Sequence, residues 1–275
     1  TSLGYGAGAN SASPNGNRNG VNVGTNAGRY AISGGNNVAV GISAGQYVEG
    51  DNNIAQGYSA GYYIKGNENV SIGTNANVGS ATEKLEVSKT VAIGSDAKTS
   101  ANNAIAMGNT AQAKTTHSIA IGQNASAGDD SANTEQKGVS AVAIGHGAQA
   151  NYYDAIAIGA RATVAPAAGN TTAADSIAVG VEATADNYKT TAIGTYARAK
   201  GRQSTVIANN VQGSNYSTAS GTRAQVYGVE TTVSGNNSVA IGDTNNIESA
   251  RTYALGNNIN AAAGTQDSLV FGTRA

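Results

Sequence analysis

Ser118-Ile-Ala-Ile-Gly122 is the stretch that decides the fold, because close copies of it recur through the whole chain. Val142-Ala-Ile-Gly145 and Val239-Ala-Ile-Gly242 are two of these copies. The closing glycine, here called the marker glycine, falls at 6, 24, 41, 57, 73, 94, 108, 122, 145, 159, 180, 194, 221, 242, 256 and 272, with Ala208 in one further place. The commonest step is fourteen, as from 94 to 108 to 122. A fixed period of this kind predicts a stack of similar coils.

The residues after each marker glycine alternate in polarity. Glu182, Ala183, Thr184 and Ala185 follow Gly180 in this pattern. Alternation with a period of two predicts a strand with one wet face. The Val-Ala-Ile strand before the glycine is apolar throughout, which is typical of a strand covered on both faces. Each coil is therefore expected to supply two short strands to two parallel sheets packed back to back. The glycine would form the turn, where φ is positive or a side chain would crowd the backbone.

The composition does not suit an ordinary globular core. The chain has one Phe, no Trp and 37 Gly. No other segment is apolar enough to cover the second face of the Val-Ala-Ile strand. We therefore predict that further copies of the chain cover it, in an obligate homo-oligomer.

The whole chain, 1–275, is predicted to be one repeat-built domain. The segment 1–72 has longer coils, of sixteen to eighteen residues, that contain Ala-Gly-x-Tyr. The segment 73–220 has 14-residue coils with projecting loops near 78–89, 127–138 and 165–175, and 221–275 forms irregular terminal coils. Glycines at 221, 228, 235 and 242 leave the register between 221 and 256 open.

Tyr30, Tyr47 and Tyr63 occupy the same place in the longer coils, the sixth position after a marker glycine. They are expected to stack as a ladder on successive coils. Aromatic packing that stiffens the wider coils is a better explanation for this ladder than ligand binding.

A basic stretch is the candidate ligand-binding surface. Arg198, Lys200 and Arg202 follow one marker glycine, and Arg161 is expected to pair with Glu182 on the next coil, which contributes little energy. The remaining cations are expected to form an exposed patch that binds a protein or glycan. The candidate ligand-binding residues are Arg198, Lys200, Arg202, Tyr152, Tyr153 and Tyr188.

No catalytic, metal or cofactor site is predicted. The histidines His117 and His146 lie more than one coil apart, and Asp129-Asp130 is better explained as a solvated loop tip than as a cation site. The formal net charge is −1 with dispersed charges, which argues against nucleic-acid binding. No apolar run approaches the roughly 20 residues of a membrane-spanning helix.

The repeated Asn-x-x-Val-Ala-Ile-Gly-x-x-Ala-x-Ala pattern resembles the YadA-like head repeats of trimeric autotransporter adhesins, over roughly residues 3–272. This resemblance implies a left-handed parallel β-roll, with three rolls side by side in an elongated homotrimer. It also implies a bacterial cell surface location and attachment to host extracellular matrix, host cell-surface protein or glycan, or other bacterial cells. Contact with the membrane would be made only through a stalk and C-terminal anchor that this stretch does not contain.

The preferred interpretation is a non-enzymatic adhesin head that binds repeated ligands through three equivalent faces. A trimeric phage-type receptor-binding fibre shares nearly all of these features. A β-helical ice-binding protein would need flat, uninterrupted rows of Thr, and the outer rows here are mixed. A hexapeptide-repeat acyltransferase would need a period of six.

Overall fold

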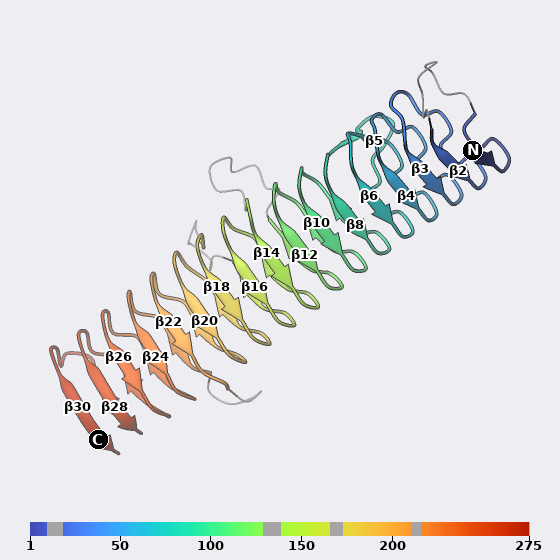
Figure 1. Cartoon of the computed structure of the whole chain (residues 1–275). Coiled ribbons are helices and arrows are strands. Elements are labelled where there is room, and N and C mark those ends of the chain that lie inside the picture. The colour runs from blue at the N-terminus through green and yellow to red at the C-terminus, as the bar shows by residue number, and fades with distance from the viewer. Residues whose placement is uncertain (10–18, 129–138, 166–172, 211–215, 275) are drawn as a thin grey trace. The chain divides into compact units, whose positions relative to one another are not determined.

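The computed structural model describes residues 1–9, 19–128, 139–165, 173–210 and 216–274. These residues form short strands and no helix. The chain divides into two compact units, Thr1–Asp130 and Ser131–Ala275. Within each unit, every strand pairs in parallel with the corresponding strand one coil away (Figure 1). The predicted all-β fold of stacked parallel coils is confirmed.

The first sheet consists of the strands that precede the marker glycines. In the unit Thr1–Asp130 these are β1 (Ser2–Leu3), β2 (Val21–Val23), β3 (Val38–Val40), β4 (Ile54–Gln56), β6 (Val70–Ile72), β8 (Val91–Ile93), β10 (Ile105–Met107) and β12 (Ile119–Ile121). In the unit Ser131–Ala275 they are β14 (Val142–Ile144), β16 (Ile156–Ile158), β18 (Ile177–Val179), β20 (Thr191–Ile193), β22 (Thr205–Ile207), β24 (Gln225–Tyr227), β26 (Val239–Ile241), β28 (Tyr253–Asn257) and β30 (Leu269–Thr273).

The second sheet consists of the shorter strands that follow the marker glycines. In the unit Thr1–Asp130 these are β9 (Lys98–Thr99), β11 (Gln112–Ala113) and β13 (Ser126–Ala127). In the unit Ser131–Ala275 they are β15 (Gln149–Ala150), β17 (Thr163–Val164), β19 (Thr184–Ala185), β21 (Arg198–Ala199), β23 (Thr218–Ala219), β25 (Thr232–Val233), β27 (Asn246–Ile247) and β29 (Asn260–Ala261).

The strand register shows the period directly. Val91 pairs with Ile105, and Ile105 pairs with Ile119, so the chain advances by fourteen positions in each of these coils. Val38 pairs with Ile54 and Ile54 with Val70, which gives 16-residue coils nearer the N-terminus. Equivalent positions of the repeat therefore lie side by side on successive coils, and each position becomes a row along the sheet.

Glycine is required at the marker position both by the backbone conformation there and by the small distance to the next coil. Gly108 has a φ of 134°, a region that L-residues rarely adopt. A Cβ on Gly108 would lie 2.5 Å from the carbonyl oxygen of Gly122 in the next coil. The backbone N–H of Gly108 donates to the carbonyl of Ile93 at 2.7 Å, which fixes this close approach. The predicted role of the glycine in the turn is confirmed.

Two of the predicted marker positions were wrong. Gly4, and not Gly6, follows β1 directly and takes the marker conformation with a φ of 132°. Gly228, and not Gly221, follows β24, while Gly221 lies in the opposite turn against Gly235. The seven-residue spacing of glycines in this region reflects both turns of each 14-residue coil, so the spacing alone could not say which turn was which.

The core is narrow and consists mainly of alanine. Ala178, Ala183 and Ala185 come from three positions of the repeat, and all are fully buried. A row of buried hydroxyls lies beside them, in which the Ser176 Oγ accepts from the backbone N–H of Thr190 at 3.0 Å. Small side chains are needed here because the two sheets of one coil lie close together.

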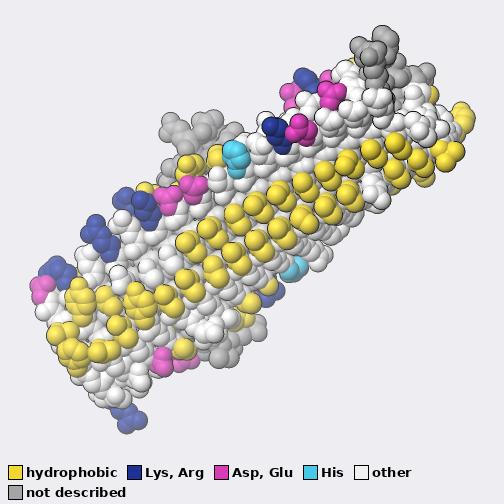
Figure 2. Space-filling model, in the orientation of Figure 1, with side chains coloured by type: hydrophobic (Ala, Val, Ile, Leu, Met, Phe, Trp, Pro, Cys, Tyr) yellow, Lys and Arg dark blue, Asp and Glu magenta, His cyan; other side chains and the backbone are white. Residues whose placement is uncertain are grey.

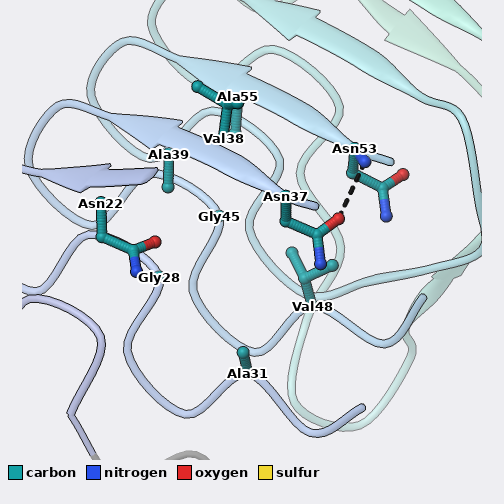
Figure 3. Close-up of a pocket in the computed structure, with 10 residues that line it drawn as sticks. All are labelled: Asn22, Gly28, Ala31, Asn37, Val38, Ala39, Gly45, Val48, Asn53 and Ala55. Carbon is teal, nitrogen blue, oxygen red and sulfur yellow. Dashed lines mark hydrogen bonds between the residues drawn. The ribbon is translucent and has the colours of Figure 1, made fainter. Parts of the chain in front are cut away.

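The wider N-terminal coils contain a buried row of asparagines. The backbone N–H of Asn53 donates to Asn37 Oδ1 at 2.8 Å (Figure 3). The backbone N–H of Asn69 donates in turn to Asn53 Oδ1 at 3.1 Å. The sequence reasoning did not identify this ladder. It satisfies backbone groups that are buried inside a wider coil, where an unpaired polar group would be costly.

The segment 78–89, predicted as a projecting loop, contains a short strand that forms a separate two-stranded sheet. β7 (Leu85–Glu86) pairs in parallel with β5 (Ile64–Lys65). Lys65 forms an ion pair with Glu86 at 2.8 Å, and Lys84 forms one with Glu49. The predicted loops at 127–138 and 165–175, and Asp129-Asp130, lie largely or wholly outside the described residues.

Candidate binding surfaces

The tyrosines at the sixth position of the wide coils form a stacked ladder. The rings of Tyr30 and Tyr47 lie 4.9 Å apart, and those of Tyr47 and Tyr63 lie 4.3 Å apart, both nearly parallel. Tyr62 meets Tyr47 edge-on at 5.8 Å, and the Arg29 guanidinium lies 4.5 Å from the Tyr30 ring centroid. The ring faces are thus largely occupied by one another, which suits a structural role.

The ladder also shifts the acidity of its central member. Burial, followed by the neighbouring Tyr63, raises the pKa of the Tyr47 hydroxyl above its ordinary value. An ordinary tyrosine is already neutral at physiological pH, and the raised pKa keeps the Tyr47 phenol neutral further into the alkaline range.

Two neighbouring coils of the unit Ser131–Ala275 carry the basic patch, defined as Lys189, Arg198, Lys200 and Arg202. Lys200 and Arg202 are exposed, and Arg198 is half-buried. The Arg202 guanidinium and the Lys189 Nζ lie 5.2 and 5.1 Å from the ring centroid of Tyr188. Salt bridges among the described residues do not include any of the four cations. The four cations of the patch therefore lie close together, and none of them forms an ion pair with a described carboxylate.

Arg198 is held by a tyrosine that sequence reasoning missed. Its guanidinium lies 4.2 Å from the ring centroid of Tyr216, and Tyr216 stacks on Tyr196 at 4.9 Å. Tyr216 takes the place of the next member of the row that contains Tyr196. Additional residues separate the two coils, so the 14-residue period gave no signal for this contact.

Asp186 lies beside the basic patch on the preceding coil. Burial raises the pKa of its carboxyl above the ordinary value, while Lys200 and Arg198 oppose this shift. Its backbone N–H donates to the carbonyl of Ala199 at 2.9 Å, which places Asp186 on the coil next to Arg198 and Lys200.

Arg161 is separate from the patch. Its Nε donates to Glu182 Oε1 at 2.9 Å, so the predicted pairing between neighbouring coils is confirmed. The Arg161 side chain is exposed and that of Glu182 is partly exposed, and such a pair contributes at most about 1 kcal/mol.

The predicted tyrosines are only partly brought together. Tyr188 contacts the patch directly through Arg202 and Lys189. Tyr153 is exposed and lies two coils from Tyr188 in the same row, because the carbonyl of Tyr153 accepts from the N–H of Asp175 and that of Ala174 accepts from the N–H of Lys189. Tyr152 is half-buried beside Tyr153.

The interior offers no room for a ligand among the described residues. The cavity in the wide coils, shown in Figure 3, has a volume of about 10 Å³ and is lined by residues such as Asn22, Gly28 and Ala39. That is the lower limit for one water molecule. Among the described residues, no cluster of His, Asp or Glu could hold a metal ion. The same residues form no helix with the length and apolar character needed to cross a membrane. Binding must therefore use the surface.

The first sheet presents an exposed apolar face. The middle residue of each strand points inward, as Ala192 does, while the first and third residues point outward. The first residues form the first row of this apolar face and the third residues form its second row, and within each unit both rows are largely apolar (Figure 2). Ile193 and Ile207 in the second row are 38% and 44% exposed. Neither row contains a charged side chain in the strands described.

Comparison with known families found one matching family model, the YadA head domain repeat, at 89–111, 100–125, 137–162, 172–197, 185–207 and 219–244. A comparison with curated proteins found no match. The matched segments include strands of the apolar face and the strand that carries Arg198, on coils with the marker-glycine geometry. The chain therefore belongs to the family that carries the YadA head domain repeat.

Proposed function

We propose that this chain, over residues 1–275, is the head of a homotrimeric surface adhesin. The observation that carries the proposal is the apolar face. Its outward Val and Ile side chains recur on coil after coil without a charged residue in the described strands. Burying the exposed part of each, about two fifths of the side chain at Ile193 and Ile207, would contribute roughly 1 kcal/mol. A surface of this length in contact with water is typical of an interaction site. Membership of the YadA head repeat family favours an assembly in which three copies of the chain cover this face for one another.

The trimer would display its second sheets to the surroundings. The function we propose is non-enzymatic attachment to host extracellular matrix, host cells or other bacteria. Three equivalent surfaces on one particle would convert weak single contacts into strong attachment. The location that accompanies this role is the bacterial cell surface, with attachment to the outer membrane through a stalk and anchor.

The basic patch, with Tyr188 and the neighbouring Tyr152 and Tyr153, is the ligand-binding site that we propose. Its cations form no ion pair with a described carboxylate, and Arg198 and Arg202 are held against tyrosine rings. These features favour a protein or glycan that presents negative charge. Ice binding is disfavoured, because Arg198 interrupts the row of Thr184 and Thr218 in the second sheet.

Charge reversal tests the ligand site. The double variant R198E/K200E should reduce attachment to immobilised matrix proteins and glycans at least several-fold, and the loss should shrink as salt weakens the wild-type interaction. The matched control is K89E/K98E, which makes the same charge change at exposed positions of the other unit. Equal attachment by all three proteins, at equal trimer content, would remove the basic patch from the proposal.

A further inference from the structure

One stretch of the apolar face is polar. Ile177 and Val239 occupy the first row on either side of it. Between them Thr191, Thr205 and Gln225 lie on three consecutive coils and pair in register. We call these three residues the polar tier. Their places in the repeat are filled by Val or Ile on most other coils, so in the first row the change is confined to these three coils.

The polar tier has hydrogen-bonding capacity that its own chain leaves unused. The Tyr227 hydroxyl donates to Gln225 Oε1 at 3.2 Å. No hydrogen bond between described residues uses Gln225 Nε2 or the hydroxyls of Thr191 and Thr205 as donors. Water satisfies these groups while the face is exposed. Once the face is covered they need partners on the covering surface, because an unsatisfied buried donor is costly.

We propose that the polar tier lies at the threefold axis and fixes the axial register of the three chains by hydrogen bonding to its equivalents. This inference rests on the trimer proposed above. Equivalent residues of three copies meet only near the axis. Away from the axis the tier would face the second row of a neighbour, where Ile193 and Ile207 offer no polar group to Thr191 and Thr205. Tyr227 carries the one hydroxyl in the second row of these three strands, and it already bonds Gln225 of its own chain.

A register device is needed because the rest of the face is repetitive. A copy displaced by one coil would still place Val and Ile side chains against Val and Ile side chains, as at Ile156 and Ile177. The same displacement would bring one end of the polar tier against Ile177 and the other against Val239, and would leave the donors of Thr191 and Gln225 there unpaired. A single polar layer in an otherwise apolar interface selects register in this way in coiled coils.

Disulfide crosslinking tests the axial position, and the absence of cysteine from the chain makes every crosslink unambiguous. Oxidised Thr205→Cys trimers should give a covalent dimer that reductant reverses, because equivalent Cα atoms near the axis come within the roughly 4.4–6.8 Å that a disulfide spans. Ile207→Cys, on the same strand but in the second row, is the matched control and should crosslink several-fold less. Efficient crosslinking of Ile207→Cys instead would overturn the axial placement and leave the trimer intact. A monomeric mass before oxidation would instead overturn the trimer itself.

Mixed trimers test the register. Chains with Ile156→Cys and chains with Ile177→Cys, distinguished by a mass tag, are refolded together and oxidised. Aligned chains should crosslink only between identical variants, because the coil spacing of about 4.8 Å adds to the lateral distance and exceeds disulfide reach. Adding T191V/T205V/Q225L to both chains should raise the mixed product several-fold through slipped assembly. If this variant remains trimeric and the mixed product does not increase, the polar tier does not set the register.

Discussion

At the scale of single residues, the turn next to the first sheet depends on a glycine that no other residue can replace without rearrangement. Gly159 has a φ of 130°, and a Cβ there would lie 2.4 Å from the carbonyl oxygen of Gly180. Two residues after the glycine the backbone is also left-handed, but with φ near 55°, as at Arg161 and Glu182. Side chains are tolerated at that second position because a φ near 55° is the left-handed region that L-residues can adopt at modest cost.

Gly159→Ala is therefore expected to destabilise the protein by about 2–4 kcal/mol, through conformational strain and a backbone clash together. Gly147→Ala is the matched control. Gly147 has a φ of 64° and its Cβ would come no closer than 3.6 Å to Arg161, so a cost of about 1 kcal/mol is expected. Urea unfolding at equal protein concentration measures both. Equal losses would contradict the stacking of glycine on glycine as the cause.

Asp186 should make stability depend on pH. Its folded-state pKa is raised by burial, so its contribution is fully present below the unfolded value of about 3.9 and is lost as pH rises through the folded value. Asp186→Asn should therefore raise the melting temperature at neutral pH, and the gain should disappear near pH 3.5. A gain of the same size at both pH values, or a loss at neutral pH, would show that burial does not dominate at this carboxyl.

At the scale of elements, the wide N-terminal coils differ from the 14-residue coils in what fills them. An asparagine row and a tyrosine ladder replace part of the alanine core. The ladder follows from the register, because the N–H of Tyr47 donates to the carbonyl of Arg29 and that of Tyr63 donates to the carbonyl of Gln46. Each tyrosine is thereby placed directly over the one before.

Tyr47→Ala removes both stacking contacts of the ladder at once. We expect a loss of about 2–3 kcal/mol, from two aromatic pairs and the buried ring area. Tyr47→Phe keeps the stack and should cost less than about 1 kcal/mol. Tyr58→Ala, at an exposed ring outside the ladder, should change stability by less than about 0.5 kcal/mol. Thermal unfolding followed by near-ultraviolet circular dichroism reports on the tyrosines directly.

At the scale of the whole molecule, the two sheets have opposite surface chemistry. The first sheet exposes aliphatic side chains, while the second exposes threonine, glutamine, asparagine and charged residues. This division gives each coil one surface suited to contact with other copies of the chain and one suited to contact with a polar external ligand. The proposed trimer and the proposed ligand site therefore occupy different sheets and can be tested separately.

Ile207→Asp places one carboxylate per chain in the apolar face and should prevent trimer formation. Burying unpaired like charges costs several kcal/mol each, which exceeds the contribution of the isoleucine they replace. Light scattering should then give one third of the wild-type mass. Gln149→Asp, at an exposed position of the second sheet, should leave the mass unchanged. A wild-type protein that already has the monomer mass would contradict the assembly.

Most of the fold could be predicted from the sequence, because the repeat encodes it many times over. The Ala at the third position after most marker glycines and the apolar run before them recur often enough to fix the strands and the parallel pairing. The ligand site was less predictable. Arg198 and Tyr188 could be placed by their positions in the repeat, but Tyr216 could not, since its coil contains additional residues.

The sequence by itself determined the parallel coils, their commonest length and the inward alanines, because local periodicity and steric demand agree at every repeat. Only the tertiary structure decided which glycine closes each terminal coil, since Gly221 and Gly228 satisfy the same spacing. It also decided that Asp186 lies beside Arg198 and Lys200, and that the asparagines form a buried ladder. Those contacts join residues in neighbouring coils, and the register that brings them together depends on coil lengths that local sequence does not specify.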